Sequence, residues 1–418
     1  MTALEIIETI FKVFTTVVGL YMLFRGLFGI RRYVDDLNLD KHCAQSTFAL
    51  VIPARNEQNV IGNLIRNLRY MDYPNDHYDI FVIADNCDDD TARVAREAGA
   101  VVFERNEPDK RSKGFALKFF VNKLKTYEKQ YDAIGVFDAD NLVKPCFLKR
   151  MDAELCKGHR ILQGYKDIKN PYDTWVTQCY SIFNWQLDRF YHLPRGRAGI
   201  GTILNGSGFV IRTDYLFEYG WETSSLVEDL EYAMQGVLRG VGVRWVHGAI
   251  VYDEQPLDFK TSWIQRKRWM AGIWYCTRKY TMKLFMYAIK NMSIGALDVC
   301  MYTFMFLSGI VGIGVCIWDA INIFISSGAL PSIQFLLWAM LIAIVVQIVF
   351  AFIAVHSERK DVKKCIPGCL LCPIFNATTL LLCARAIIKP NTTWVPIKHT
   401  RNIDMGYIID QENKNDDK

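Results

Sequence analysis

The chain has 418 residues, which allows two or three domains at about 150 residues per domain. Its 49 lysine and arginine residues against 44 aspartate and glutamate residues give a formal net charge of +5, too small an excess to indicate a nucleic-acid-binding protein. Hydrophobic residues make up 51% and charged residues 22%, which excludes a disordered scaffold. Residues 31–290 have the composition of a soluble protein, but both ends carry long apolar runs, so a simple soluble enzyme is disfavoured as well.

The first apolar run covers residues 6–30 and is long enough to cross a hydrocarbon core of about 30 Å at about 1.5 Å per residue. A secretory signal peptide is the alternative, but the run begins among acidic rather than basic residues, and no small-x-small cleavage site follows it. Arg31 and Arg32 lie on its C-terminal side, which by the positive-inside rule puts the soluble portion in the cytoplasm. We therefore predict an N-terminal transmembrane helix within residues 1–31.

Two further apolar runs, 294–326 and 333–355, predict a pair of transmembrane helices within residues 293–356. Two crossings return the chain to the cytoplasm, and the basic stretch 357–364 fits that side. The 12 cysteines are scattered, and a cytoplasmic location requires no disulfide among them. The sequence thus predicts a multi-pass protein of the plasma membrane with a cytoplasmic soluble domain.

The last apolar run, 365–388, belongs to a segment from 357 to 390 whose relation to the membrane has two readings. Pro367 and Pro373 interrupt its first third, and proline breaks a helix. The run is either a fourth crossing or a bent helix that lies at the membrane interface. The second alternative keeps the C-terminal segment and tail, 391–418, in the cytoplasm.

The soluble portion, 32–262, alternates short apolar runs with segments of helical periodicity. The apolar runs predict strands at 48–53, 79–84, 100–103 and 133–137. The helical segments between them cover 60–68, 88–98 and 114–125. Strands that alternate with helices predict a parallel, doubly wound α/β sheet, whose ligands bind at the carboxyl ends of the strands.

Polar residues follow three of these strands, at 55–57, 85–90 and 138–141. The last group contains Asp138 and Asp140, two carboxylates two residues apart at a strand end. Hard oxygen ligands suit Mg²⁺ or Mn²⁺, and Mg²⁺ is usually held by one or two carboxylates together with substrate phosphates. The pattern therefore favours a metal–diphosphate site, although such a triplet can also simply cap a helix or a turn.

Four further segments carry residues that suit binding or catalysis. Residues 110–114 form a basic turn with a glycine, either a phosphate-binding loop or a solvated one. Residues 204–209 hold two glycines, which indicates a close approach of backbone or ligand. Asp229 precedes a helical pattern and is either a functional carboxylate or an N-cap. Residues 263–269 combine a basic cluster, an amide and two tryptophans, which predicts amphipathic interfacial helices over 263–292.

In this order the motifs resemble those of the family 2 glycosyltransferases, in particular the membrane-embedded, processive branch that includes cellulose, chitin and hyaluronan synthases. The resemblance covers roughly residues 47–269 and the arrangement of apolar runs on either side. It rests on the motifs Val-Ile-Pro-Ala-Arg-Asn-Glu57, Ala84-Asp-Asn-Cys-Asp88, Lys113-Gly-x-Ala-Leu117, Asp138-Ala-Asp140, Val-Glu-Asp229 and Gln265-Arg-Lys-Arg-Trp269.

The resemblance implies a GT-A-like fold, a UDP-sugar donor, a Mg²⁺ or Mn²⁺ cofactor, and site residues in four roles. The general base is Asp229. The residues expected to hold the donor are Glu57, Asp85, Lys113, Asp138 and Arg268. The expected metal ligands are Asp138 and Asp140. The residues expected to contact the acceptor are Gln265, Trp269, Gly206 and Ser207.

The function that the resemblance implies is an inverting transferase that builds a β-linked polysaccharide and passes it through its own spans. The alternative is a non-processive transferase that adds a single sugar to a lipid, as ceramide glucosyltransferases do. A third reading is a non-catalytic membrane scaffold. The expected partners are the donor, a growing polysaccharide or lipid acceptor, and membrane lipid, with an accessory subunit or a homo-oligomer to complete a thin channel wall.

Two departures from the family pattern weaken any inference about the sugar. Ala84 stands where the family usually has a first acidic residue, and Val227 stands where the synthases have threonine. The C-terminal stretch 392–401 resembles the basic, tryptophan-containing segment that follows the last spans of these synthases and faces the cytoplasmic active site. This likeness favours the interfacial, non-crossing alternative for residues 365–388.

Overall fold

An eight-stranded sheet, in the order β3-β2-β1-β4-β7-β6-β8-β5, organises the soluble domain. The structure is a computed structural model that describes residues 3–30, 43–390 and 403–416. The predicted features at Arg31, Arg32 and 392–401 lie outside these described residues. The strands are β1 (Phe48–Ala54), β2 (Tyr78–Asp85), β3 (Val101–Arg105), β4 (Ala133–Val136), β5 (Leu142–Val143), β6 (Ile161–Ile168), β7 (Phe209–Arg212) and β8 (Val243–Asp253).

The first four strands are parallel, as the sequence predicts, but the whole sheet is mixed. Strand β7 runs antiparallel to both β4 and β6, and β8 is parallel to β6. The helices between the first strands are α2 (Ile61–Leu68), α3 (Thr91–Glu97) and α4 (Lys113–Leu124). Helix α3 begins three residues later than predicted because Asp89 accepts a hydrogen bond from the Thr91 backbone, which keeps the acidic residues before it in a loop.

Both faces of the sheet are buried, which explains why strand β1 has an unbroken apolar sequence. Phe48, Leu50 and Ile52 belong to one hydrophobic core, and Ala49 and Val51 belong to the other. Successive side chains of a strand point to opposite faces, so a strand covered on both sides needs apolar residues at every position. The remaining helices of the soluble portion are α5 (Phe147–Cys156), α6 (Trp175–Leu187), α7 (Leu193–Ala198), α8 (Thr213–Tyr219), α9 (Glu228–Leu238) and α14 (Met405–Asp416), with short turns at Asn75–His77 and Asp188–His192.

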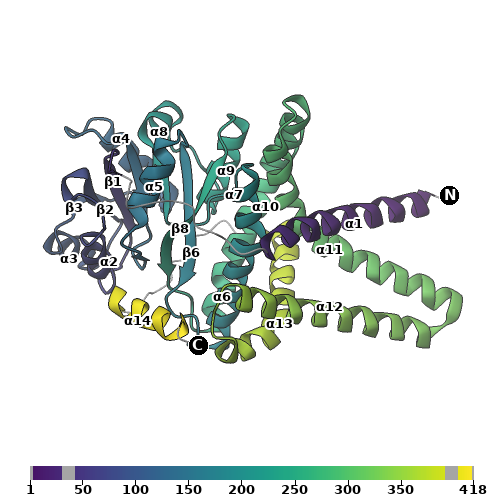
Figure 1. Cartoon of the computed structure of the whole chain (residues 1–418). Helices are drawn as coiled ribbons and strands as arrows, with labels where there is room; N and C mark the ends of the chain where they lie inside the picture. Colours follow the sequence, from purple (N-terminus) through teal and green to yellow (C-terminus); the bar gives the residue numbers. More distant parts are fainter. Residues whose placement is uncertain (1–2, 31–42, 391–402, 417–418) are drawn as a thin grey trace.

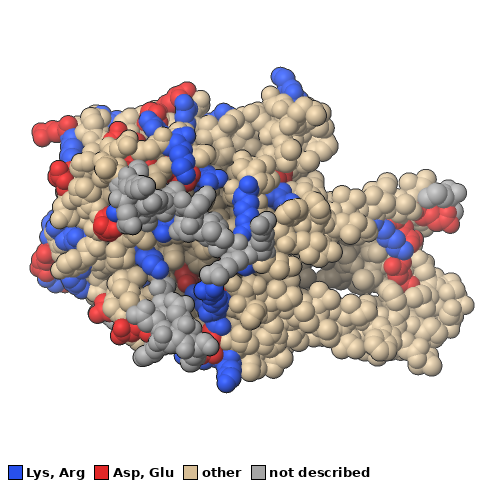
Figure 2. All heavy atoms as spheres, viewed as in Figure 1, with Lys and Arg blue, Asp and Glu red and all other residues tan. Residues whose placement is uncertain are grey.

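Among the described residues, four helices are long and apolar enough to cross a membrane: α1 (Ala3–Ile30), α11 (Ile294–Ser327), α12 (Ala329–Ser357) and α13 (Val362–Ile388). Three of them, α1, α11 and α12, project together from the sheet domain, whereas α13 packs against α6 and α10 (Phe259–Lys290) at the base of the projection (Figure 1). Figure 2 shows that charged side chains gather on the sheet domain and that the projecting helices carry few, most of them near the far end. These features describe a membrane-associated protein.

Charged pairs join α1 to α11 at two levels. Near the sheet domain, Arg25 of α1 and Arg195 of α7 both contact Asp298 of α11. Near the far end, Lys12 Nζ lies 2.7 Å from Asp319 Oδ1. Along α11 the two aspartates are about 31 Å apart at ~1.5 Å per residue, close to the thickness of a hydrocarbon core. The pairs therefore bracket an apolar span of membrane length on α11, while Lys12 and Arg25 are about 20 Å apart along α1 at the same rise.

The two prolines predicted to interrupt the last apolar run lie inside the continuous helix α13. The side chains of neighbouring helices bond its backbone there. Gly368 N donates to Gln178 Oε1 of α6 at 2.6 Å, and Arg266 Nη1 of α10 donates to the Phe375 carbonyl at 2.9 Å. Gln178 thus supplies a partner to the backbone next to Pro367, while Arg266 ties the later part of the helix to α10. This packing lets the helix continue through its prolines.

We predict that Asp298→Asn destabilises the protein by about 3–5 kcal/mol, because it leaves two buried arginines without their counter-charge. Asp298 and Arg195 are each 1% exposed in this pair. Thermal unfolding of the detergent-solubilised protein, followed by near-UV circular dichroism, measures the effect. The matched control on the same helix is Asp319→Asn, whose pair with Lys12 is partly exposed and whose loss is expected to matter little. Equal losses from the two substitutions would contradict the prediction.

Candidate active site

The carboxyl ends of the strands open into a pocket that extends to α10 and α11. Nearly all the side chains that the sequence analysis singled out converge here, although they come from segments far apart in the chain. They are Glu57, Asp85, Lys113, Asp138, Asp140, Gly206, Asp229, Gln265, Arg268 and Trp269. The predicted site residues therefore meet at the strand ends, the place where ligands of such sheets usually bind.

Ser207 is the predicted site residue that does not line the pocket. Its side chain is fully buried, and its carbonyl accepts a hydrogen bond from Gln163 Nε2 at 3.0 Å. The neighbouring glycines cause this orientation, because Gly206 and Gly208 have φ angles of 75° and 65°, in the left-handed region that glycine tolerates. The loop therefore presents its backbone at Gly206 to the pocket and turns the Ser207 hydroxyl inward.

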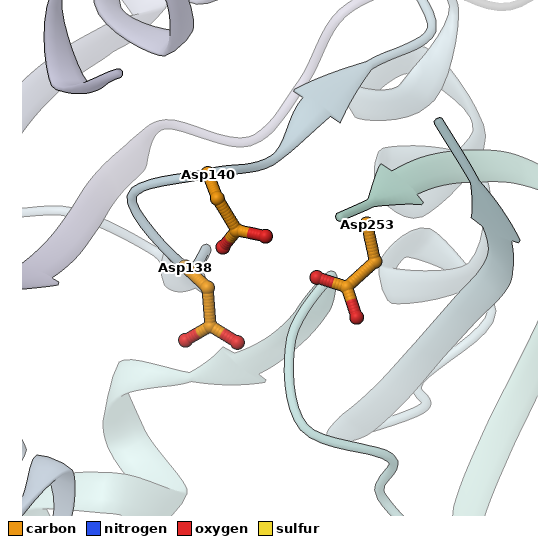
Figure 3. Close-up of side chains that lie close together, drawn as sticks. All are labelled: Asp138, Asp140 and Asp253. Atoms are coloured by element: carbon orange, nitrogen blue, oxygen red, sulfur yellow. The ribbon is translucent and has the colours of Figure 1, made fainter. Parts of the chain in front are cut away.

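Three aspartates form an acidic cluster at the base of the pocket. Ligand oxygens of Asp138, Asp140 and Asp253 all lie within 4.8 Å of one another, and the carboxyl groups turn toward a common space (Figure 3). Asp138 and Asp140 follow strand β4, and Asp253 ends strand β8. The sequence analysis did not single out Asp253. The signal that could have found it is an aspartate that closes an apolar strand, the same pattern that drew attention to Asp138.

Hydrogen bonds fix the orientation of these carboxylates. Asp140 Oδ2 accepts from Glu254 N at 3.0 Å. Asp253 accepts from Asn141 Nδ2 at 3.1 Å and from Gln255 Nε2 at 2.9 Å. Oxygen ligands that converge and are held by other residues suit a hard divalent cation such as Mg²⁺ or Mn²⁺. The donor set therefore fits the metal that the sequence predicted.

Lys113 places a positive charge beside the cluster. It is the first residue of α4, whose N-cap Ser112 accepts a hydrogen bond from Phe115 N at 3.3 Å. The Lys113 ammonium contacts the Asp138 carboxylate and donates to the Gly206 carbonyl at 2.7 Å. Burial disfavours the ammonium, but nearby carboxylates, with Asp138 first, outweigh it and raise the pKa of Lys113 above its ordinary value. The side chain therefore stays cationic and suits a phosphate.

The neighbouring strands β2 and β3 provide a second buried ion pair at the pocket. Their register puts Asp85 opposite Arg105, and the Arg105 guanidinium contacts the Asp85 carboxylate. Burial raises the pKa of Asp85, and Arg105 opposes that rise. Asn86 Nδ2 donates to the same carboxylate at 2.8 Å. The sequence analysis did not anticipate Arg105, a buried cation at the carboxyl end of the third strand.

Asp229 lies in the first turn of α9 and faces the glycine loop. It is the second residue of the helix, and its carboxylate accepts a hydrogen bond from Gly206 N. The N-cap position belongs to Val227, so the capping alternative for Asp229 is wrong. The adjacent Glu228 is half-buried in the same pocket, and desolvation together with the charge of Asp229 raises the pKa of Glu228 to about 7.

Helix α10 brings three more predicted residues to the pocket from the membrane side. It is one helix where the sequence predicted several over 263–292. Gln265 and Trp269 lie one turn apart on the same face, with Arg268 beside them. Gln265 Oε1 accepts from the Tyr180 hydroxyl at 2.8 Å, and the Trp269 ring meets Tyr180 edge-on with centroids 5.8 Å apart. Tyr180 of α6 therefore orients this face.

The end of the pocket that lies toward the long apolar helices is itself apolar. Its lining residues come from three helices that meet next to Trp269. They are Phe183 and Leu187 of α6, Met270 and Ile273 of α10, and Tyr302 and Phe306 of α11. The pocket thus combines a charged end at the sheet with an apolar end at the level of the membrane helices.

Residues 44–272 match the family model described as Glycosyltransferase like family 2. The chain therefore belongs to this family, the family 2 glycosyltransferases. A solved structure, the mannosyltransferase PcManGT from Pyrobaculum calidifontis in complex with GDP-Man and Mn²⁺, is similar with a TM-score of 0.59 and 15% identity, covering 84% of this chain and 97% of that one. That likeness supports the fold, a GT-A-like mixed sheet with long apolar helices.

Curated relatives of known name are similar at the sequence level. The Probable glycosyltransferase YdaM of Bacillus subtilis is 26% identical over 277 residues, 63% of this chain and 64% of that protein. Glucomannan 4-beta-mannosyltransferase 7 of Arabidopsis thaliana is 26% identical over 291 residues, 65% of this chain and 51% of that protein. Beta-monoglucosyldiacylglycerol synthase of Synechocystis is 26% identical over 245 residues, 55% of this chain and 50% of that protein. The chain spans about half to two thirds of the length of these relatives.

We predict that donor binding weakens as the pH rises through about 7. Glu228 is neutral below its raised pKa of about 7 and anionic above it, and an added negative charge in the pocket repels a diphosphate. Calorimetric titration of a nucleoside diphosphate sugar with Mn²⁺ at pH 6 and pH 8 measures the difference, which we expect to be several-fold. The diphosphate of this ligand is a diester, so it has no group that titrates between these values. Glu228→Gln removes the titrating group and is expected to bind equally at both values. A pH dependence that persists in this variant would contradict the assignment.

Proposed function

We propose that the chain transfers a sugar from a nucleoside diphosphate sugar, UDP-linked in the first instance, to an acceptor hydroxyl at the membrane surface with inversion of configuration. One observation carries the proposal: Asp229, the aspartate cluster and the Gln265–Trp269 face of α10 line a single pocket. A donor at the sheet end and an acceptor at the α10 end would meet next to Asp229. A binding module or a scaffold has no need of that combination.

The proposed donor site lies at the strand ends. Glu57 and Asp85 would hold the nucleoside, and Lys113 and Arg268 would neutralise charge on the diphosphate as it leaves. A divalent cation held by Asp138, Asp140 and Asp253 would supply further stabilisation of that leaving group. Because Lys113 remains charged, its contribution does not depend on pH in the neutral range.

The proposed general base is Asp229. An acceptor hydroxyl is a poor nucleophile, and a carboxylate within reach removes its proton as the new bond forms. The Gly206 N–H donates to Asp229 and would hold the free oxygen toward the acceptor. A single displacement at the anomeric carbon inverts it, so an α-linked donor yields a β-linked product. Trp269 and Gln265 would position the acceptor by ring stacking and hydrogen bonding.

The first candidate product is a β-linked polysaccharide. The named similarity to a glucomannan 4-beta-mannosyltransferase supports it, and so does the position of Trp269 where the pocket turns toward the membrane helices. Three helices, α1, α11 and α12, would cross the plasma membrane, with α13 at the interface and the catalytic domain in the cytoplasm. A second copy or an accessory subunit would then complete the wall around a translocating chain.

The second candidate is transfer of a single sugar to a lipid. The apolar end of the pocket favours it, because Phe183, Leu187, Ile273 and Phe306 offer no hydrogen bonds to a sugar but suit an acyl or similar chain. The named similarity to a beta-monoglucosyldiacylglycerol synthase points the same way. In this alternative the three crossing helices need not enclose a channel.

The deciding experiment supplies purified protein with Mn²⁺ or Mg²⁺ and a panel of UDP-sugars, with GDP-mannose included. Nucleotide release is recorded with and without diacylglycerol or ceramide, and the products are separated by size. A high-molecular-weight product from one donor establishes the polysaccharide synthase. Nucleotide release that requires lipid and yields one small glycolipid establishes the second candidate. The absence of metal-dependent transfer from any donor would contradict the proposal.

We predict that Asp229→Asn lowers transfer by about 10²–10⁴-fold, the usual contribution of a general base. Asparagine keeps an oxygen for the Gly206 N–H, so the loop and the donor affinity are expected to stay near wild type. Product formation and calorimetric binding of the nucleoside diphosphate, measured on the same preparation, separate the two effects. Asp214→Asn, an exposed substitution outside the pocket, is the control. A fully active Asp229→Asn variant would remove Asp229 from its proposed role.

A further inference from the structure

A second lysine lies against the aspartate cluster, and neither the sequence motifs nor the proposed mechanism uses it. Lys166 Nζ is 2.9 Å from Asp253 Oδ2, and the side chain lines the same pocket. Lys166 is only 8% exposed, so its charge does not serve to keep the protein surface soluble. Burial disfavours its ammonium, but Asp253 and Asp138 outweigh the effect and keep the pKa of Lys166 above its ordinary value.

The strand register explains why the lysine reaches this place. Strands β6 and β8 are parallel, and Lys166 pairs with Val251. Asp253 follows Val251 by two positions and therefore points to the same face of the sheet. On its other side, the Lys166 ammonium lies close to the glycine loop at Gly206. A side chain at Gly206 would have its Cβ only 3.0 Å from Lys166 Nζ, which shows how near the two are. Lys166 thus stands between the metal-binding carboxylates and the loop that contacts Asp229.

The charge balance of the cluster indicates what the lysine does. The cluster has three carboxylates, those of Asp138, Asp140 and Asp253. Two ammonium groups contact them directly, Lys113 at Asp138 and Lys166 at Asp253, and compensate two of the three formal negative charges. A divalent cation that arrives alone meets two ammonium groups that repel it and a net charge of only one. A cation that arrives with a diphosphate brings anionic oxygens that both lysines can bind.

We propose that Lys166 serves as a counter-cation of the aspartate cluster. It pairs with Asp253 until a divalent cation binds that carboxylate, and it then binds the diphosphate of the donor. This inference rests on the proposed function, because it requires a metal and a nucleoside diphosphate in the pocket. After the exchange, Asp253 keeps its bonds from Asn141 and Gln255, so the carboxylate stays oriented when the lysine leaves. The long, flexible stem of lysine allows the movement.

The consequence is that metal and donor bind cooperatively. In the protein without donor, Lys166 competes with the cation for Asp253, so Mn²⁺ alone binds weakly. With the diphosphate present, the lysine has another partner and the competition ends. The coupling is reciprocal, so Mn²⁺ must tighten nucleotide binding by the same factor by which the nucleotide tightens Mn²⁺ binding.

The test measures Mn²⁺ affinity of the full-length protein in detergent, by the electron paramagnetic resonance signal of free Mn²⁺, with and without UDP. We expect Lys166→Met to bind Mn²⁺ alone at least ~10-fold more tightly than the wild type, because one repelling charge is gone. We expect its affinity for UDP with saturating Mn²⁺ to fall by about tenfold, because a charged phosphate partner is lost. The enhancement of Mn²⁺ binding by UDP should shrink accordingly.

Two further variants control for charge and for folding. Lys166→Arg keeps the positive charge and is expected to bind Mn²⁺ alone as weakly as the wild type. Asp167 follows Lys166 on strand β6, so its side chain lies on the opposite face of the sheet. Lys360 donates a hydrogen bond to Asp167 at 2.6 Å, and Lys360→Met removes this lysine. It should leave Mn²⁺ binding unchanged.

Each outcome bears on one of the two claims. Suppose that the wild-type protein binds UDP with Mn²⁺, but that Lys166→Met binds Mn²⁺ alone no more tightly than the wild type does. This result overturns the inference and leaves the proposed function standing. The same holds if Lys360→Met tightens Mn²⁺ binding as much as Lys166→Met does. A wild-type protein that binds neither Mn²⁺ nor UDP overturns the metal-dependent function itself. If Lys166→Met does not fold, Lys166→Gln, which keeps a polar side chain, decides between the same outcomes.

Discussion

The mutual repulsion of carboxylates at the strand ends is the constraint on which the rest of the pocket depends. Ligand oxygens of Asp138, Asp140 and Asp253 lie within 4.8 Å of one another, so each carboxylate adds to the electrostatic cost of placing the others there. The fold meets this demand with two lysines from different elements and with hydrogen bonds from the segments that follow β4 and β8. If Lys166 acts as proposed, the same arrangement would make the pocket selective for a cation accompanied by an anion.

Helix α10 connects the long apolar helices to this pocket, because it contacts α13 with one side and lines the pocket with another. Its pocket face carries Gln265, which Tyr180 of α6 holds, while Arg266 on the same turn bonds α13 through the Phe375 carbonyl and the Thr378 hydroxyl. The two contacts fix the rotation of α10 about its axis. Gln265 and Trp269 are therefore positioned by the same interactions that hold α13 against α6 and α10, and a shift of α13 would move them.

The sequence was informative where the chemistry is local and less so where it depends on strand register. Asp138 and Asp140 are neighbours in the chain, and the alternation of strands and helices places them at a strand end without further information. Asp253 joins them only because β8 ends beside the end of β6, where Asp253 pairs with Ile168 after a register shift between Gly164 and Tyr165. Lys166 depends on the same register, since a displacement of one residue would turn its side chain to the other face.

The depth of the acceptor end constrains both candidate functions. Tyr302 and Phe306 follow Asp298 on α11 by one and two turns, about 6 and 12 Å further along the helix at ~1.5 Å per residue. If the Arg25–Asp298 contact marks the cytoplasmic boundary of the hydrocarbon core, the apolar end of the pocket already lies within the lipid. An acceptor that reaches Asp229 from that end must therefore present its hydroxyl from the membrane side. A soluble sugar satisfies this requirement poorly, whereas a lipid headgroup, or a glycan chain already threaded between the helices, satisfies it well.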